Sequence, residues 1–149
     1  MREILFRSKR KDNGEWITGN LLFYPDVNRA YMSLGVFKGG TFLEVQKDTL
    51  GQYTGLTDKN GKKIFEWDII ELTSNDYYGS KYKSKVVFRD GCFGIEVVVC
   101  DDITFFHRIG EVHHETDMGG THAITYQYEV IGNIHDNPEL LKDGGENND

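Results

Sequence analysis

The chain has 149 residues, a formal net charge of −7 and a hydrophobic share of 38%, which leave room for one ordinary domain or two small barrels. Nine Phe, eight Tyr and two Trp supply large side chains that suit a small β-rich core. No apolar run approaches the ~20 residues of a membrane span, and no signal peptide is recognisable, so we expect a cytoplasmic protein that does not enter a membrane.

The first half of the chain predicts short strands joined by tight turns. Residues 3–10 form a half-alternating strand, and Asn13-Gly14 is the turn signal of a hairpin whose return strand is 15–24. Gly19 inside that return strand indicates a bulge or a close backbone approach. The expected continuation is a loop at 25–30, strands at 31–36 and 41–45, and an irregular connector at 47–56.

The second half repeats this pattern. Asn60-Gly61 marks a turn into a strand at 64–72, and Asp90-Gly91 joins the strands 85–89 and 92–99. The remaining expected elements are a polar loop at 73–82, a strand at 126–134 and a short C-terminal helix at 137–141 that opens with Asn-Pro. Many hairpins and no long amphipathic helix predict a mainly β protein, built as a small barrel or barrels.

The predicted domain organisation is a single module. Residues 1–141 form one β-rich unit whose barrel-like part spans roughly 50–136, and residues 142–149 form a disordered acidic tail. If Cys92 and Cys100 lie on one strand, they are too far apart for a disulfide. A hairpin between them would allow the pairing, but a reducing compartment disfavours it, so we predict buried free thiols.

Four of the five histidines are the best metal candidates. They are His107, His113, His114 and His122. His114 and the Glu after it begin like the helical zinc-protease motif, but Met118 stands where the second His is required, so the motif fails. A loop that gathers His113 and His122 around zinc is the remaining possibility, and solvated histidines in a polar loop are the favoured one. We predict no bound metal and no cofactor.

Two groups of lysines are candidate nucleic-acid contacts. Lys59, Lys62 and Lys63 cluster at a turn, and Lys81, Lys83 and Lys85 alternate along a strand, which places the last three on one face. Such a row can follow a phosphate backbone. The favoured alternative is an edge strand whose lysines prevent aggregation. The acidic chain as a whole is not by default a nucleic-acid binder, although its first residues are basic.

Catalytic motifs are missing from the sequence. Asp68 and the pair Asp101-Asp102 are carboxylates in positions typical of turns and caps. No nucleophile elbow, phosphate loop or dinucleotide fingerprint occurs, and the Gly51–Gly55 stretch lacks the lysine that a phosphate loop needs. The sequence predicts that the protein is not an enzyme.

Three blocks, in order over nearly the whole chain, match a known pattern. They are Arg2-Glu3-Ile4-Leu5-Phe6-Arg7 with the following Lys-Arg and Trp16, residues 51–56 with 58–66, and Val130-Ile131-Gly132-Asn133-Ile134 with Asn137-Pro138-Glu139-Leu140-Leu141. Together they resemble the YopX family of phage and prophage proteins. The resemblance implies an SH3-like barrel in a phage accessory protein of uncharacterised role. The family usually has Gly where this chain has Trp67, so either the backbone differs there or positive φ is not required.

Three functional hypotheses follow. The first is a non-catalytic interaction module of a phage or prophage that acts through its surface, with an unknown protein partner or with further copies of itself. The second is a small nucleic-acid-binding β-barrel, which is less favoured. The third is a metal-dependent enzyme that uses the stretch from His107 to His122.

Overall fold

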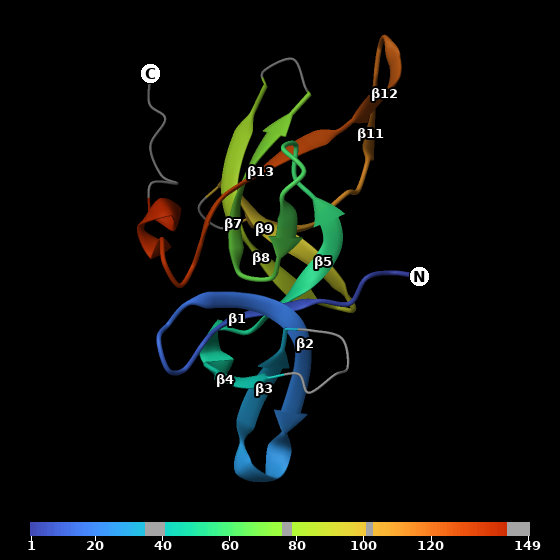
Figure 1. Cartoon of the computed structure of the whole chain (residues 1–149). Helices are drawn as coiled ribbons and strands as arrows, with labels where there is room; N and C mark the ends of the chain where they lie inside the picture. Colours follow the sequence, from blue (N-terminus) through green and yellow to red (C-terminus); the bar gives the residue numbers. More distant parts are fainter. Residues whose placement is uncertain (35–40, 76–78, 101–102, 143–149) are drawn as a thin grey trace. The chain divides into compact units, whose positions relative to one another are not determined.

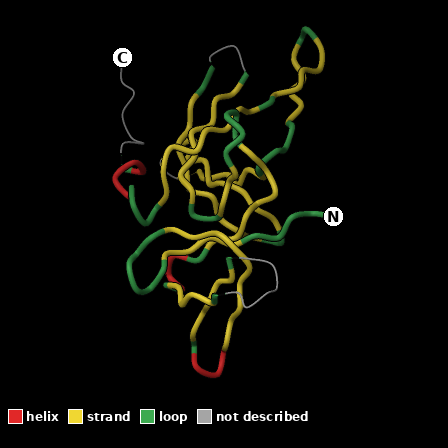
Figure 2. The backbone as a smooth tube through the Cα atoms, in the orientation of Figure 1, coloured by secondary structure: helices red, strands yellow, loops and turns green. Residues whose placement is uncertain are grey.

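The structure, a computed structural model, describes residues 1–34, 41–75, 79–100 and 103–142. These residues are mainly β-strand, and the helical segments among them are short 3₁₀ turns (Figure 2). The contacts divide the chain into two compact units, residues 1–55 and 56–149. Whether the two act as one module stays a prediction.

The first unit is an antiparallel sheet of short strands. They are β1 (Phe6–Lys9), β2 (Trp16–Tyr24), β3 (Arg29–Ser33), β4 (Phe42–Val45) and β5 (Gly51–Thr57), with 3₁₀ turns at Pro25–Val27 and Lys47–Thr49 (Figure 1). The order of these strands is β4-β3-β2-β1-β5, and β6 (Lys63–Phe65) belongs to the second unit. The predicted Asn13-Gly14 hairpin is confirmed, because β1 pairs with β2 in antiparallel register.

Gly19 has the close backbone approach that the sequence indicated. A Cβ atom on Gly19 would lie 2.2 Å from the carbonyl oxygen of Ser33, which is part of the neighbouring strand β3. Only glycine fits there without a shift of the backbone. The small core under this sheet is formed by Ala30, Met32 and Val45.

The second unit contains a five-stranded sheet in the order β10-β9-β8-β7-β13. The strands are β7 (Asp68–Ser74), β8 (Lys81–Arg89), β9 (Cys92–Cys100), β10 (Ile103–Arg108) and β13 (Tyr126–Asn133). The Asp90-Gly91 hairpin between β8 and β9 is confirmed, with both turn residues at positive φ. The core cluster of the second unit is aliphatic and consists of Ile64, Ile70, Leu72, Val86, Ile95 and Ile109.

The predicted closed barrel is not confirmed, because the described strands form open sheets. One edge strand of the second unit, β13, is already bonded on its outer side by a turn. The Lys59 amide donates to the Tyr128 carbonyl oxygen, and the Val130 amide donates to the Asp58 carboxylate. A turn therefore occupies part of the edge that barrel closure would need for another strand.

Three other predictions are not confirmed in full. The C-terminal helix is only a 3₁₀ turn at Pro138–Leu141, which is too short for an α-helix. Cys92 and Cys100 lie on one strand, and Cys92 is a free thiol as predicted, although it is partly exposed instead of buried. The predicted acidic tail lies, apart from residue 142, outside the described residues.

Trp67 adopts the left-handed conformation that the family's glycine would favour. Its φ is 70°, whereas no positive φ is recorded for Glu66 before it. The two residues form the turn between β6 and β7, and positive φ at the second turn position is typical of a type II turn. The turn therefore keeps the backbone of glycine with a bulky side chain.

Candidate functional site

The most distinctive surface of the first unit is the outer side of strands β2, β3 and β4. Six side chains line a shallow hollow there, and we call this surface the aromatic face. They are Leu22, Tyr24, Val27, Arg29, Tyr31 and Phe42. The strand register explains how they meet: Tyr31 lies opposite Leu22, and Arg29 lies opposite Tyr24.

These side chains are exposed because the other side of the same strands already forms the core. Residues alternate across a strand, so Ala30 and Met32 point inward while Arg29 and Tyr31 point outward. A single thin sheet buries only one of its faces. Phe42 keeps 56% of its accessible surface, Val27 62% and Tyr24 47%.

The aromatic rings hold a defined arrangement. The rings of Tyr24 and Tyr31 lie edge to face, with centroids 5.8 Å apart and an interplanar angle of 84°. A hydrogen bond to Tyr31 and the nearby charge of Glu44 raise the pKa of Arg29, whose strand position lies opposite Tyr24. The hollow thus combines apolar walls with one guanidinium group.

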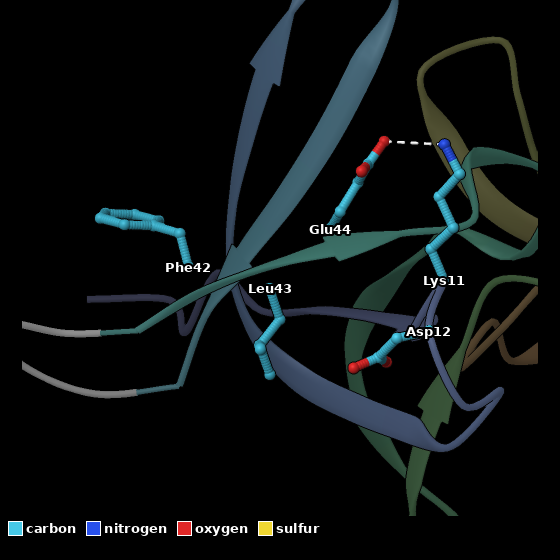
Figure 3. Close-up of a pocket in the computed structure, with 5 residues that line it drawn as sticks. All are labelled: Lys11, Asp12, Phe42, Leu43 and Glu44. Carbon is cyan, nitrogen blue, oxygen red and sulfur yellow. Dashed lines mark hydrogen bonds and ion pairs between the residues drawn. The ribbon is translucent and has the colours of Figure 1, made fainter.

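A second hollow shares Phe42 with the first and is more polar. It is lined by Lys11, Asp12, Phe42, Leu43 and Glu44 (Figure 3). Glu44 forms ion pairs with Lys11 at 2.8 Å and with Arg29 at 3.6 Å. The hydrogen bond from Lys11, with the charges of Lys11 and Arg29, holds the pKa of Glu44 below its ordinary value. The one acidic side chain of β4 is therefore compensated by two cations.

Cations and an aromatic ring also meet on β1 and β2. The Arg7 guanidinium carbon lies 4.9 Å and the Lys9 Nζ 5.3 Å from the centre of the Trp16 ring. Both distances fit cation–π interactions. These residues are half-buried.

The structure places all six candidate lysines in the second unit, and two of them form ion pairs. Lys81 forms an ion pair with Glu71 at 3.2 Å, and Lys59 pairs with Glu129. Glu71 and Glu129 lie opposite each other on β7 and β13, and Lys83 lies opposite Glu71 from the other side. Lys59 and the β8 lysines thus meet on one mixed-charge face.

The idea that these lysines guard an edge strand is wrong, because β8 lies in the middle of its sheet. Of the others, Lys85 lies on the same face of β8, while Lys62 and Lys63 lie at the 58–63 turn. Their role in nucleic-acid binding stays a prediction.

The candidate histidines are distributed over separate elements. His107 on β10 is 6% exposed, and its Nε2 lies 3.1 Å from the hydroxyl of Tyr128, which also accepts a hydrogen bond from the Gly110 amide. His113 and His114 are on β11 (His113–Asp117), and His122 is on β12 (Gly120–Ile124). The two strands pair as a hairpin that extends from the second unit, where the sequence indicated a polar loop (Figure 1).

No group of three or more metal-ligating side chains is found within the described residues. His122 instead lies 3.3 Å from the carboxylate of Asp117 on the same hairpin. Asp68 accepts a hydrogen bond from the Phe65 amide, which is turn chemistry, and Asp101-Asp102 lies outside the described residues. In the described part of the chain, no helix is long and apolar enough to cross a membrane.

Sequence reasoning missed the aromatic face. The signal was present in the run Leu21-Leu22-Phe23-Tyr24, where apolar residues occupy both faces of a predicted strand. Both faces can be buried only when a second layer covers the sheet. A chain with a 38% hydrophobic share has little material for that layer, so one face was a candidate for exposure.

Comparison with known proteins identifies the family of the chain. A crystal structure of protein EF1440 from Enterococcus faecalis is similar over 95% of this chain and 99% of that chain, with 25% sequence identity and a TM-score of 0.49. No match was found among curated proteins. The family model described as YopX protein matches residues 5–142, which is nearly the whole sequence, and the chain therefore belongs to the YopX family.

Proposed function

We propose that the protein is a non-catalytic interaction module of a phage or prophage and that it acts through the aromatic face. One observation carries the proposal: Tyr24 and Phe42, on a sheet that already has a core on its other side, and Val27, in the adjoining 3₁₀ turn, are each about half exposed or more. A contiguous exposed apolar surface on a small domain is a common mark of a binding site.

The distribution of aromatic residues supports the same proposal. Among the described residues, the two buried core clusters contain aliphatic side chains and Met32, and only two aromatic side chains, Tyr53 and Phe65, are classed as buried. Phe23, Phe42, Phe88 and Phe105 remain largely exposed instead. Aromatic side chains contribute strongly to binding because they bury much area with little loss of conformational freedom. In one form of the proposed interaction, the partner that binds such a surface is a second copy of the chain.

Site-specific photo-crosslinking in the host cell tests the proposal. A photoreactive phenylalanine analogue is placed at Tyr24, at Phe42 and, as a matched control, at Phe88, which is 53% exposed in the second unit. We expect the same adduct from both aromatic-face positions and not from Phe88. Nuclease digestion and mass spectrometry then show whether the adduct is nucleic acid, another copy of the chain or a different protein.

The proposal fails if Tyr24 and Phe42 give no adduct while the variants are folded and expressed. It also fails if Phe88 gives the same adduct in the same yield, because the contact would then not depend on the aromatic face. Sedimentation velocity of the purified protein separately tests self-association, which predicts a species larger than the monomer.

A further inference from the structure

The aromatic face continues along β2 toward cations on β1. Alternate residues of β2 share one side of the sheet, so Trp16 at its start lies on the same side as Tyr24 at its end. The strand covers about 26 Å between them, at ~3.3 Å per residue. Arg7 and Lys9 lie over Trp16 at the first end, and Arg29 lies opposite Tyr24 at the second.

The charge of the chain is divided between its two units. Residues 1–55 carry eight Lys and Arg against six Asp and Glu, whereas residues 56–149 carry nine against eighteen. The first unit therefore has a positive formal charge, although the whole chain has a net charge of −7. On the outer side of β4, Glu44 is compensated by Lys11 and Arg29.

Aromatic rings interspersed with cations on an exposed sheet match one kind of ligand. Bases stack on aromatic rings regardless of sequence, and Lys and Arg bind the phosphates between them. The length of β2 suits a tract of about four nucleotides. In a duplex the faces of the bases are already stacked on each other, so they are not available to Tyr24 or Phe42.

We infer that the outer side of β1–β4 binds single-stranded nucleic acid, with Tyr24 and Phe42 as stacking platforms and Arg7, Lys9 and Arg29 as phosphate contacts. The inference rests on the proposed function, because it names the partner of the aromatic face. It locates the site in the first unit, where cations lie beside aromatic rings, and not at Lys59 and Lys81 of the second unit, which pair with Glu129 and Glu71.

Fluorescence anisotropy with labelled oligonucleotides tests the inference on the full chain. The ligands are a thymidine oligomer of about 12 nucleotides, the matching duplex, and an abasic phosphodiester chain of equal length. We expect the single strand to bind more tightly than the other two. We also expect its affinity to fall steeply between about 50 mM and about 200 mM salt, because bound phosphates release counterions.

Paired variants assign the contacts. Tyr24→Ser and Phe42→Ser should each weaken binding of the single strand at least about fivefold but leave binding of the abasic chain unchanged, since only stacking is removed. Arg29→Gln should weaken binding to both and reduce the salt slope by about one. Phe88→Ser is the matched control and should bind like the unchanged protein. Circular dichroism and thermal melting check that each variant is folded.

Several results overturn the inference. These are absence of binding at low salt, equal affinity for duplex and single strand, and loss of binding in Lys83→Gln and Lys85→Gln but not in Tyr24→Ser or Phe42→Ser. A nuclease-resistant protein adduct as the sole product at Tyr24 and Phe42 in the crosslinking experiment overturns it as well, but leaves the proposed interaction module standing.

Discussion

Replacing Trp67 by glycine and by alanine separates the strain of its backbone from the loss of its side chain. Trp67 has a φ of 70° in the turn between β6 and β7. Two hydrogen bonds hold this backbone: the Trp67 amide donates to the Val86 carbonyl oxygen at 2.9 Å, and the Ile134 amide donates to the Trp67 carbonyl oxygen at 3.0 Å. The left-handed conformation therefore persists although it costs an L-residue about 1–2 kcal/mol.

Both variants lose the half-buried indole, which we expect to lower the free energy of unfolding by about 2 kcal/mol, less than for a fully buried Trp. They differ in the backbone. At an ordinary position alanine is more stable than glycine by about 0.4–1 kcal/mol, because glycine has more freedom in the unfolded chain. At Trp67 we expect the opposite order, with Trp67→Gly more stable than Trp67→Ala by about 1 kcal/mol, since only glycine is free of the left-handed strain.

Urea denaturation and calorimetry measure this difference. For a chain of this size it corresponds to a melting temperature about 2–4 °C higher for Trp67→Gly. Glu66, the preceding turn residue, has no positive φ recorded and is the matched control. At this position Glu66→Ala should be more stable than Glu66→Gly. If Trp67→Ala equals or exceeds Trp67→Gly, the left-handed strain at this position is absent and the reasoning is refuted.

Three further predictions concern contacts within one unit or the other. Burial opposes ionisation of Asp58, but the backbone N–H groups that donate to its carboxylate outweigh burial and lower its pKa. The ionised carboxylate therefore stabilises the fold fully above the ordinary pKa near 3.8, and this stabilisation is lost as the pH falls through the lower pKa of the folded state. Urea titrations should show Asp58→Asn about 2 kcal/mol less stable at neutral pH, with a smaller gap near about pH 3; a constant gap would contradict this. Gly19→Ala should lower stability by about 2 kcal/mol or more, because its Cβ would lie 2.2 Å from the Ser33 oxygen, and an unchanged melting temperature would argue against that contact. Tyr128→Phe should cost about 1–3 kcal/mol, because the Gly110 amide and His107 lose the hydroxyl, and calorimetry should detect this loss if the contact forms.

Local turn chemistry made much of the β structure predictable. Asn13-Gly14 and Asp90-Gly91 each join two antiparallel strands, as their sequences indicate. Such turns are readable because a few local residues set the backbone geometry, here with Gly14, Asp90 and Gly91 at positive φ. The sequence blocks of the YopX family likewise span the chain, and the family model confirms the assignment.

Properties that depend on distant contacts were not readable in this way. The lysines of β8 suggested an edge strand, but strand order depends on which strands pair, and β7 and β9 flank β8 on both sides. The four histidines near each other in sequence separate into a buried ring on β10 and a hairpin, because β-pairing sends neighbouring segments in different directions.

The sequence by itself determined that the chain is a mainly β member of its family with hairpins at defined turns, because those properties reside in short segments. Tertiary structure alone decided that there are two compact units, that Trp67 is held at positive φ by residues from β8 and from beyond β13, and that Tyr24 and Phe42 remain exposed. The physical reason is that burial and backbone strain depend on what packs against a segment. In this chain those partners lie far away in the sequence, as Val86 and Ile134 do for Trp67.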